Sequence, residues 1–165
     1  MKEKAKKKKK KQQRRQLRME FARVTAVGLH AVGRFTFEFS QLEFTIRVAL
    51  LACLELPQEY FDIVTAPYDF AMLCKVTREA LSLKTPERAA ELEQWCKDCL
   101  KLNDDRVRIA HGTWTLGPDG PSVRHVSRNS LKARHYFGTT AEIDRLSDEA
   151  QRLLQQILAF KAARA

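Results

Sequence analysis

The stretch FTFEFSQLEFTIRVALLAC, residues 35–53, decides the fold of this chain. Apolar side chains recur in it at intervals of three and four residues, which places them on one stripe of a helix. These residues are Phe39, Leu42, Ile46, Ala49, Leu50 and Cys53. The same helical pattern extends from about Gln12 to Leu56, and Pro57 is expected to end it because a proline disfavours helical geometry in the residue before it.

The aromatic side chains of this stretch are too many for one stripe. They are Phe35, Phe37, Phe39 and Phe44. We therefore expect the helix to be contacted on two sides, either as a central helix or as one that also faces a second subunit. Glu43 lies among them with Arg47 one turn later, and two interpretations remain open: an ion pair on a solvated edge, or a carboxylate directed into a polar pocket.

Three more helices follow. After a connection over residues 57–69, Asp69 can cap a helix from about Phe70 to Leu83. Thr85 as N-cap and Pro86 at the first position begin a third helix, which continues to about His111. The last helix opens near Thr140 and runs to about Phe160, with acidic residues in its first turn.

Between the last two helices the pattern changes to short strand-like runs, Thr113–Leu116 and Ser122–Val126, with the turn signal GPDGP between them. We expect a hairpin or ordered loop of about 25 residues there, a length set by the turn-rich span between the two helical patterns. The predicted fold is all-α, an antiparallel bundle of four to five helices with this short hairpin or ordered loop before the last helix.

The positive charge is confined to the N-terminal segment. Of 30 basic and 20 acidic side chains, 11 basic and one acidic lie in residues 1–18, which leaves 19 of each sign in residues 19–165. The net charge of +10 therefore belongs to residues 1–18, which we call the basic segment. The sequence predicts a disordered or transiently helical tail over residues 1–18 and one helical-bundle domain over residues 19–165.

Such a segment can bind any polyanion without sequence preference, whether RNA, DNA or an anionic membrane, or it can act only to keep the protein in solution. The residues expected to contact nucleic acid are Lys6, Lys7, Lys8, Lys9, Lys10, Lys11, Arg14 and Arg15. No apolar run has the roughly 18 residues that a transmembrane helix needs, and no signal peptide opens the chain. These features predict a cytoplasmic protein without a transmembrane segment.

Four cysteines are present: Cys53, Cys74, Cys96 and Cys99. Free thiols in the core are the expected state in a cytoplasmic protein. A redox Cys-x-x-Cys at Cys96 and Cys99 would need a preceding strand, and a zinc site with His111 would lack a fourth ligand. We therefore expect no metal and no cofactor.

Arg106 and His111 carry the most specific chemistry in the sequence. A His can move a proton to or from a ribose 2′-hydroxyl, and an Arg can hold the charge that develops on the phosphate. Attack by the 2′-hydroxyl needs no metal, which favours RNA over DNA as the substrate. The same residues, with Arg108 and Gly112, also fit an ordinary helix C-terminus whose basic side chains complement the helix dipole.

Five residues along a helix turn the side-chain direction by about 140° beyond one full turn, so Arg106 and His111 do not share a face. A working pair would need a helix that loosens before Gly112, an Arg that reaches around the helix, or a two-fold dimer that brings two copies together.

The run Arg106-Val107-Arg108-Ile109-Ala110-His111, continuing Gly112-Thr113-Trp114, resembles the Arg-x4-His motif of the HEPN superfamily of helical ribonucleases and RNA-binding domains. The segment from Gly33 to Glu43 is similar to the first long helix of bacterial members, and the resemblance spans roughly residues 20 to 160.

The resemblance implies a homodimer in which Arg106 and His111 of both subunits line a cleft that cuts RNA without metal. It assigns supporting roles to Glu43 and to Asn103, the amide nearest to Arg106 on the helix, and Arg108 and Arg124 are expected to contact RNA. It also implies a toxin or antiphage defence effector, with an antitoxin or regulatory protein as a partner. The alternative is a non-catalytic HEPN-like module that binds RNA or protein.

Overall fold

The computed structural model describes residues 2–117, 120–126 and 133–162. Its helices are α1 (Lys2–Leu54), α2 (Phe61–Thr65), α3 (Phe70–Lys84), α4 (Ala89–His111) and α5 (Thr140–Ala162), with 3-10 turns at Gln58–Tyr60 and Pro86–Arg88. The strands are β1 (Thr113–Gly117), β2 (Gly120–Val126) and β3 (Ala133–Tyr136). The predicted all-α bundle with an ordered hairpin before the last helix is confirmed.

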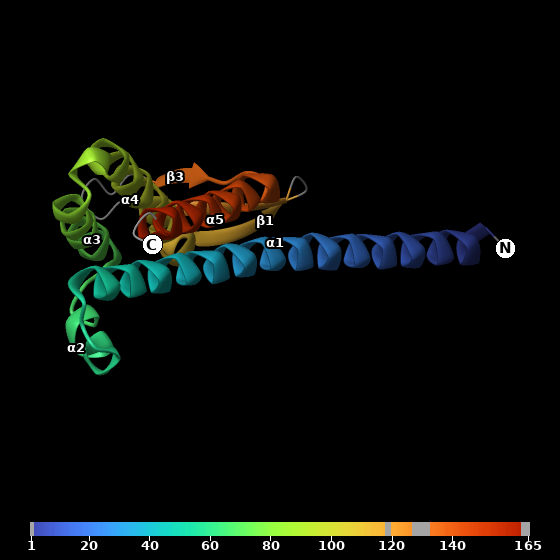
Figure 1. The fold of residues 1–165 in the computed structure, drawn as a ribbon. Coiled ribbons are helices and arrows are strands. Elements are labelled where there is room, and N and C mark those ends of the chain that lie inside the picture. Colours follow the sequence, from blue (N-terminus) through green and yellow to red (C-terminus); the bar gives the residue numbers. More distant parts are fainter. Residues whose placement is uncertain (1, 118–119, 127–132, 163–165) are drawn as a thin grey trace.

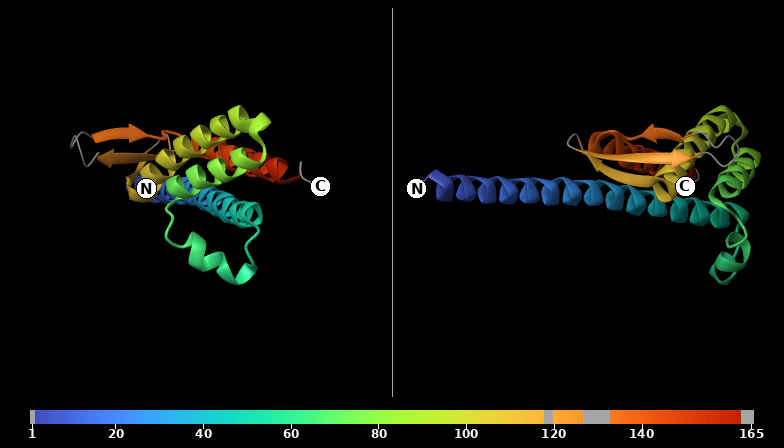
Figure 2. Two further views of the ribbon diagram at one scale, coloured as in Figure 1. Left: turned by 60° about the vertical axis from the view of Figure 1, so that its left-hand side comes forward. Right: turned by 180° about the vertical axis from the view of Figure 1, so that it is seen from behind.

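Helix α1 is the axis of the molecule. Its C-terminal half packs along α5 and against α3, whereas its N-terminal part projects beyond the body as a free rod (Figure 1). In every view α5 and the strands lie on one side of α1 and α2 on the other (Figure 2). The helix therefore has one face in the core and an opposite face turned away from it.

The basic segment is part of α1, which is continuous from Lys2 and has no break between residues 18 and 19. Lys, Arg and Gln favour helix, and no Pro or Gly interrupts the sequence before Gly28. Since the packed half of α1 already provides the nucleus, each further turn needs only the favourable propagation step. The tail and the bundle thus share one helix.

The ends of two helices show how local residues shape the fold. Helix α1 ends at Leu54, before Pro57, and the next residue, Glu55, has a left-handed φ of 58°. The predicted cap at Asp69 is confirmed, since its carboxylate accepts from the Met72 N–H at 2.7 Å. Thr85 does not cap the following helix with its side chain; its hydroxyl donates back to the Leu81 carbonyl at 2.9 Å.

The hairpin is larger than expected, because a third strand completes it. The three strands form an antiparallel sheet in the order β1-β2-β3, with Thr113 opposite Arg124 and Arg124 opposite His135. Val123 is fully buried and is the residue through which β2 reaches the core. Residues 133–136 carry no alternating pattern that would have distinguished a strand from the loop expected there.

The core lies where α1, α3, α4 and α5 meet. Its fully buried large side chains include Trp95, Phe35, Leu42, Ile46, Leu50, Leu73, Leu92, Ile143, Leu153 and Ile157. Trp95 joins α4 to α5, since its indole N–H donates to the Leu153 carbonyl at 3.1 Å. Ion pairs at the surface link the helices, and Arg34 with Asp148 joins α1 to α5 at 2.6 Å.

Replacing Leu153 by Ala should lower the free energy of unfolding by about 2–5 kcal/mol, because the side chain is fully buried and its removal leaves a cavity. Leu83→Ala is the matched control: Leu83 is 86% exposed, and the change should stay within about 0.5 kcal/mol. Urea unfolding followed by circular dichroism measures both. Equal losses in the two variants would contradict the position given to α5.

Candidate functional site

The candidate site lies at the C-terminal end of α4. This helix remains regular to His111, and the Gly112 N–H donates to the Arg108 carbonyl at 2.9 Å. Gly112 itself is extended, with φ −81° and ψ 156°, so it ends the helix without a left-handed turn. Of the three routes to a working pair, a helix that loosens before Gly112 is therefore not the one that the structure contains.

Glycine is required at position 112 by the approach of β2. A Cβ there would lie 2.5 Å from the Arg108 carbonyl oxygen and 2.5 Å from Cγ2 of Val123. Val123 is fully buried, so it cannot move aside without opening the core. The tight contact explains how the chain turns directly from α4 into β1, and it holds His111 at the junction.

Arg106 lies on the side of α4 that faces α1. Arg106 comes seven positions after Cys99, which is buried. This spacing is about two helical turns, so both residues lie on one stripe of α4. The side chain is exposed, and its guanidinium carbon lies 5.8 Å from the centre of the Phe39 ring. Among the side chains that the structure describes, no carboxylate pairs with Arg106, and this leaves its charge available to an anion.

His111 is exposed in the last turn of α4, which also contains the half-buried Arg108. Because the helix is unbroken, His111 points about 140° away from Arg106 around the helix axis. The structure therefore places the two residues within one and a half turns, but on different sides of α4. Basic side chains at a helix C-terminus also complement the negative end of the helix dipole.

Glu43 has a partner of its own. Its carboxylate accepts from Arg47 at 2.5 Å, and Arg47 also donates to the Thr65 carbonyl at 2.5 Å. Of the two interpretations open from the sequence, the i,i+4 ion pair is the one that the structure contains. Through Arg47, this pair ties α1 to the end of α2 and gives Glu43 a structural function.

The other residues predicted near the site are placed as follows. Arg108 pairs with Asp105 at 2.5 Å, and its guanidinium lies 4.7 Å from the centre of the Tyr136 ring, so it joins α4 to β3. Asn103 is half-buried, three residues before Arg106. Arg124 is exposed on β2 opposite Thr113, two residues after His111, so the sheet brings it to the same end of α4.

The described basic side chains of the basic segment lie along one broad side of the projecting helix, within an arc of about 140°. Lys10, Lys11, Arg14, Arg15 and Arg18 are all exposed. The side chains of Lys6, Lys7, Lys8 and Lys9 lie outside the described part of the chain. A basic helix face that stands clear of the body is a surface on which a phosphate backbone can lie.

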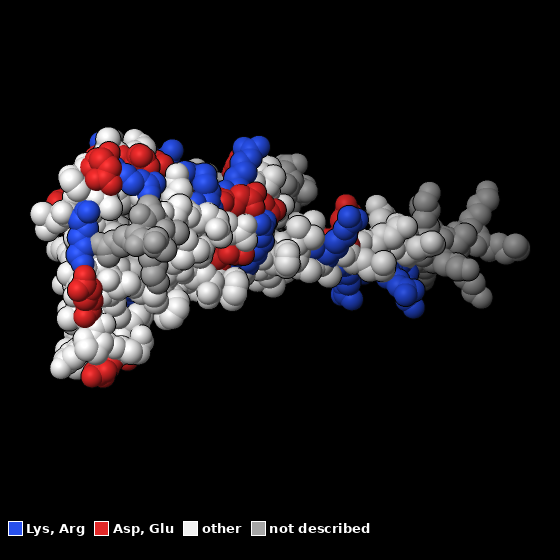
Figure 3. All heavy atoms as spheres, viewed as in Figure 1, with Lys and Arg blue, Asp and Glu red and all other residues white. Residues whose placement is uncertain are grey.

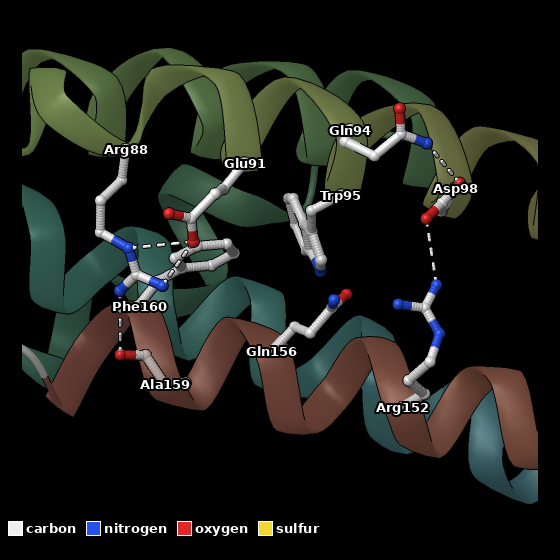
Figure 4. Close-up of a pocket in the computed structure, with 9 residues that line it drawn as sticks. All are labelled: Arg88, Glu91, Gln94, Trp95, Asp98, Arg152, Gln156, Ala159 and Phe160. Carbon is white, nitrogen blue, oxygen red and sulfur yellow. Dashed lines mark hydrogen bonds and ion pairs between the residues drawn. The ribbon is translucent and has the colours of Figure 1, made fainter.

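A separate hollow of about 410 Å³ lies between the first half of α4 and α5 (Figure 4). Two arginines lie at its ends, but each is already bonded to an acid: Arg88 to Glu91 at 2.9 Å and Arg152 to Asp98 at 3.0 Å. The hydrogen bonds that Arg152 donates to Glu149 and Asp98 raise the pKa of Arg152. With its charges paired within the chain, this hollow offers a phosphate little attraction. The sequence had not indicated it, because its residues come from two distant helices.

The four thiols are buried in the core, as expected. Burial raises the pKa of Cys96 and of Cys99, which makes both poor nucleophiles. Within the described residues, no group of three or more His, Cys, Asp and Glu side chains is arranged to hold a metal ion.

Within the same residues, no helix combines the length and the apolar character needed to cross a membrane. No family model matches the chain, and neither the curated proteins nor the solved structures contain a match to it.

Replacing Gly112 by Ala should destabilise the fold by about 1–3 kcal/mol, because the added methyl group collides with β2 and with the end of α4. Gly138→Ala is the control, since a Cβ at position 138 meets no atom within 4 Å. Thermal unfolding of both variants measures the difference. A Gly112→Ala protein as stable as the control would show that β2 does not press on the helix end.

Proposed function

We propose that this protein binds RNA and cleaves it without a metal, as an endoribonuclease of the HEPN type. The observation that carries the proposal is the state of Arg106: an exposed guanidinium, without a carboxylate partner among the described side chains, resting on Phe39 five residues before exposed His111. Other arginines of the body, such as Arg34, Arg47 and Arg152, are neutralised by acids.

In this mechanism Arg106 binds the scissile phosphate and stabilises the charge that develops on it. His111 takes the proton from the ribose 2′-hydroxyl or returns one to the leaving 5′-oxygen. The 2′-oxygen attacks phosphorus, the P–O5′ bond breaks, and a cyclic phosphate and a 5′-hydroxyl result. The basic segment of α1 and Arg124 add affinity for the phosphate backbone.

The rotation along α4 sets a condition on this chemistry. Because Arg106 and His111 of one chain point about 140° apart, a shared cleft needs Arg106 of one chain and His111 of another. The proposed enzyme is therefore a homodimer whose cleft lies between two α4 ends. A toxin or antiphage role, and an antitoxin or regulatory protein bound over the cleft, belong to the same proposal.

The second candidate is a module that binds RNA or protein without cleaving it. Two observations favour this candidate. The unbroken end of α4 places Arg106 and His111 of one chain on different sides of the helix, and Glu43 is paired with Arg47. On this alternative Arg106 contributes to affinity, and His111 only completes the helix terminus.

The rate at which total RNA is cleaved in excess EDTA should fall about 100- to 1,000-fold in Arg106→Ala, because this variant lacks the guanidinium that binds the phosphate. His111→Ala should lose about 100- to 10,000-fold, which is the usual contribution of a general acid–base residue. Arg145→Ala, an exposed arginine on α5, is the control and should retain full activity. Gel electrophoresis of the RNA measures its cleavage by each of the three variants and by the unmodified protein.

Cleavage that persists in both Arg106→Ala and His111→Ala would refute the catalytic assignment. Binding without cleavage in the unmodified protein would instead establish the second candidate.

Replacing Lys10, Lys11, Arg14 and Arg15 by Gln should weaken RNA binding and flatten its dependence on salt. Each lost phosphate contact lowers the slope of log K against log salt concentration by about 0.7 for single-stranded RNA. Glutamine keeps the helix propensity of the segment, so the change tests charge alone. Fluorescence anisotropy with a labelled oligonucleotide gives the slope, and an unchanged slope would exclude the segment from the interface.

A further inference from the structure

The side of α1 that packs into the core continues beyond the body. An α-helix has about 3.6 residues per turn, so residues eighteen positions apart point in the same direction after five turns. Leu17 and Phe21 come eighteen positions before Phe35 and Phe39, which are both buried. Leu17 and Phe21 are each 60% exposed, because the body does not cover this part of the helix. The core side of α1 is therefore open to solvent where the helix projects.

Two basic residues lie on the same side of the projecting helix. Lys10 comes eighteen positions before Gly28, which is buried, and Arg14 comes eighteen positions before Val32, which packs against the core. We call the four exposed residues the inner face: Lys10, Arg14, Leu17 and Phe21. In the space-filling view, blue atoms of Lys and Arg and white atoms share the projecting part of α1, with little red (Figure 3). The inner face thus combines cations with an aliphatic and an aromatic side chain.

The inner face lies in the corner between the projecting helix and the body. Helix α5 and the strands stand on the same side of α1 as this face (Figure 1 and Figure 2). Val24 is already half-buried, and it follows Phe21 by three residues, which span about 4.5 Å along the helix. A flat lipid bilayer cannot lie against Phe21 without meeting the body, whereas a flexible single strand can enter the corner.

Charge disfavours a second copy of this chain as the occupant. Residues 1–18 carry 11 basic side chains and one acidic side chain, so two such segments repel each other. The same density of positive charge matches a nucleic-acid backbone, which has one negative charge on each nucleotide. The chemistry of the inner face therefore fits a polyanion that also has flat apolar groups.

We propose that the inner face binds an unpaired stretch of RNA. One base stacks on the ring of Phe21, and Leu17 packs against the neighbouring nucleotide. Lys10 and Arg14 contact the phosphates. Surfaces that hold single strands combine a basic track with aromatic side chains on which bases stack. In a duplex the faces of the bases lie against one another, so only an unpaired base can reach Phe21.

This site deepens the proposed ribonuclease, and it rests on that proposal for the choice of RNA as the ligand. It adds that the substrate is single-stranded where α1 holds it. Arg106 lies 5.8 Å from the centre of the Phe39 ring, on the core side of α1. Phe21 and Phe39 are about 27 Å apart along the helix axis. An RNA strand stacked on Phe21 therefore lies on the same side of α1 as Arg106.

The test measures binding without cleavage. The full chain is titrated into a labelled 2′-O-methyl oligonucleotide of about 12 nucleotides, a length that single-strand-binding surfaces cover. Its methylated ribose lacks the attacking hydroxyl, so the protein cannot cut it. Fluorescence anisotropy gives the dissociation constant for the unpaired oligonucleotide and for its duplex with the complementary strand.

Phe21→Ala should raise the dissociation constant for the unpaired oligonucleotide about 5- to 150-fold, which is the contribution of one base–aromatic stack. The constant for the duplex should stay within about twofold, because its bases do not reach the ring. The slope of log K against log salt concentration should not change, since the variant loses no charge. Phe21→Trp should keep the affinity, whereas Phe21→Leu should lose it, because stacking needs a ring.

Met19→Ala is the matched control. Met19 is 63% exposed, lies two residues before Phe21 and points about 160° away from it around the helix. Its replacement should leave both dissociation constants within about twofold, since Met19 is not on the inner face. Circular dichroism checks that each variant keeps the helix content of the unmodified protein.

The proposal is overturned if Phe21→Ala binds the unpaired oligonucleotide as tightly as the unmodified protein does, or if Met19→Ala loses as much affinity as Phe21→Ala. Polyglutamate carries charge without bases, and weaker binding of polyglutamate by Phe21→Ala would show that the inner face takes an acidic protein instead. Binding to vesicles of phosphatidylserine and phosphatidylcholine that depends on Phe21 would show that it takes a membrane.

The two proposals can fail separately. Binding that depends on Phe21, without cleavage of any RNA, would leave the inner face as a single-strand site and refute the catalytic assignment. Cleavage that depends on Arg106 and His111, with binding that does not depend on Phe21, would refute the stacking site alone.

Discussion

The packing of α1 against α5 is the interaction on which the rest of the structure depends. Phe35, Leu42 and Ile46 on one helix, and Ile143 and Ile157 on the other, are removed from water. Burial of a side chain of this size contributes about 1.5–3 kcal/mol, so the contact outweighs any of the surface ion pairs around it. Once α1 is held along one face, α3 and α4 close the bundle, and the opposite face stays outside.

The same constraint separates the surfaces that are available for function. Arg106 lies at the core side of α1. Helix α2 lies on the opposite side, and the basic segment continues along the helix axis (Figure 1). One long helix therefore connects a candidate anion site and a basic rod. Each has different chemistry, and each can be altered by substitutions that leave the core intact.

Most of the architecture could be predicted from the sequence, because helical periodicity and caps are local. The pattern of Leu42 and Ile46 gave the core face of α1, and Asp69 marked the start of α3. The third strand was not predicted, because whether a segment joins a sheet depends on the strand with which it pairs. The helical state of the basic segment could not be decided from the sequence, because charge repulsion opposes helix formation there and propagation from a folded nucleus favours it. The identity of Arg106 and His111 was readable, but their relation across α4 followed only from the unbroken helix.

The sequence by itself determined which segments are helices, which face of α1 is buried and where the net charge lies, because these properties depend on spacing along the chain. Only the tertiary structure decided that Arg47 takes the carboxylate of Glu43, that Arg106 has an aromatic neighbour and no described acid, and that β2 requires Gly112. These contacts join residues on different elements or depend on exposure. They are set by how packed helices and strands dock, which local spacing does not encode.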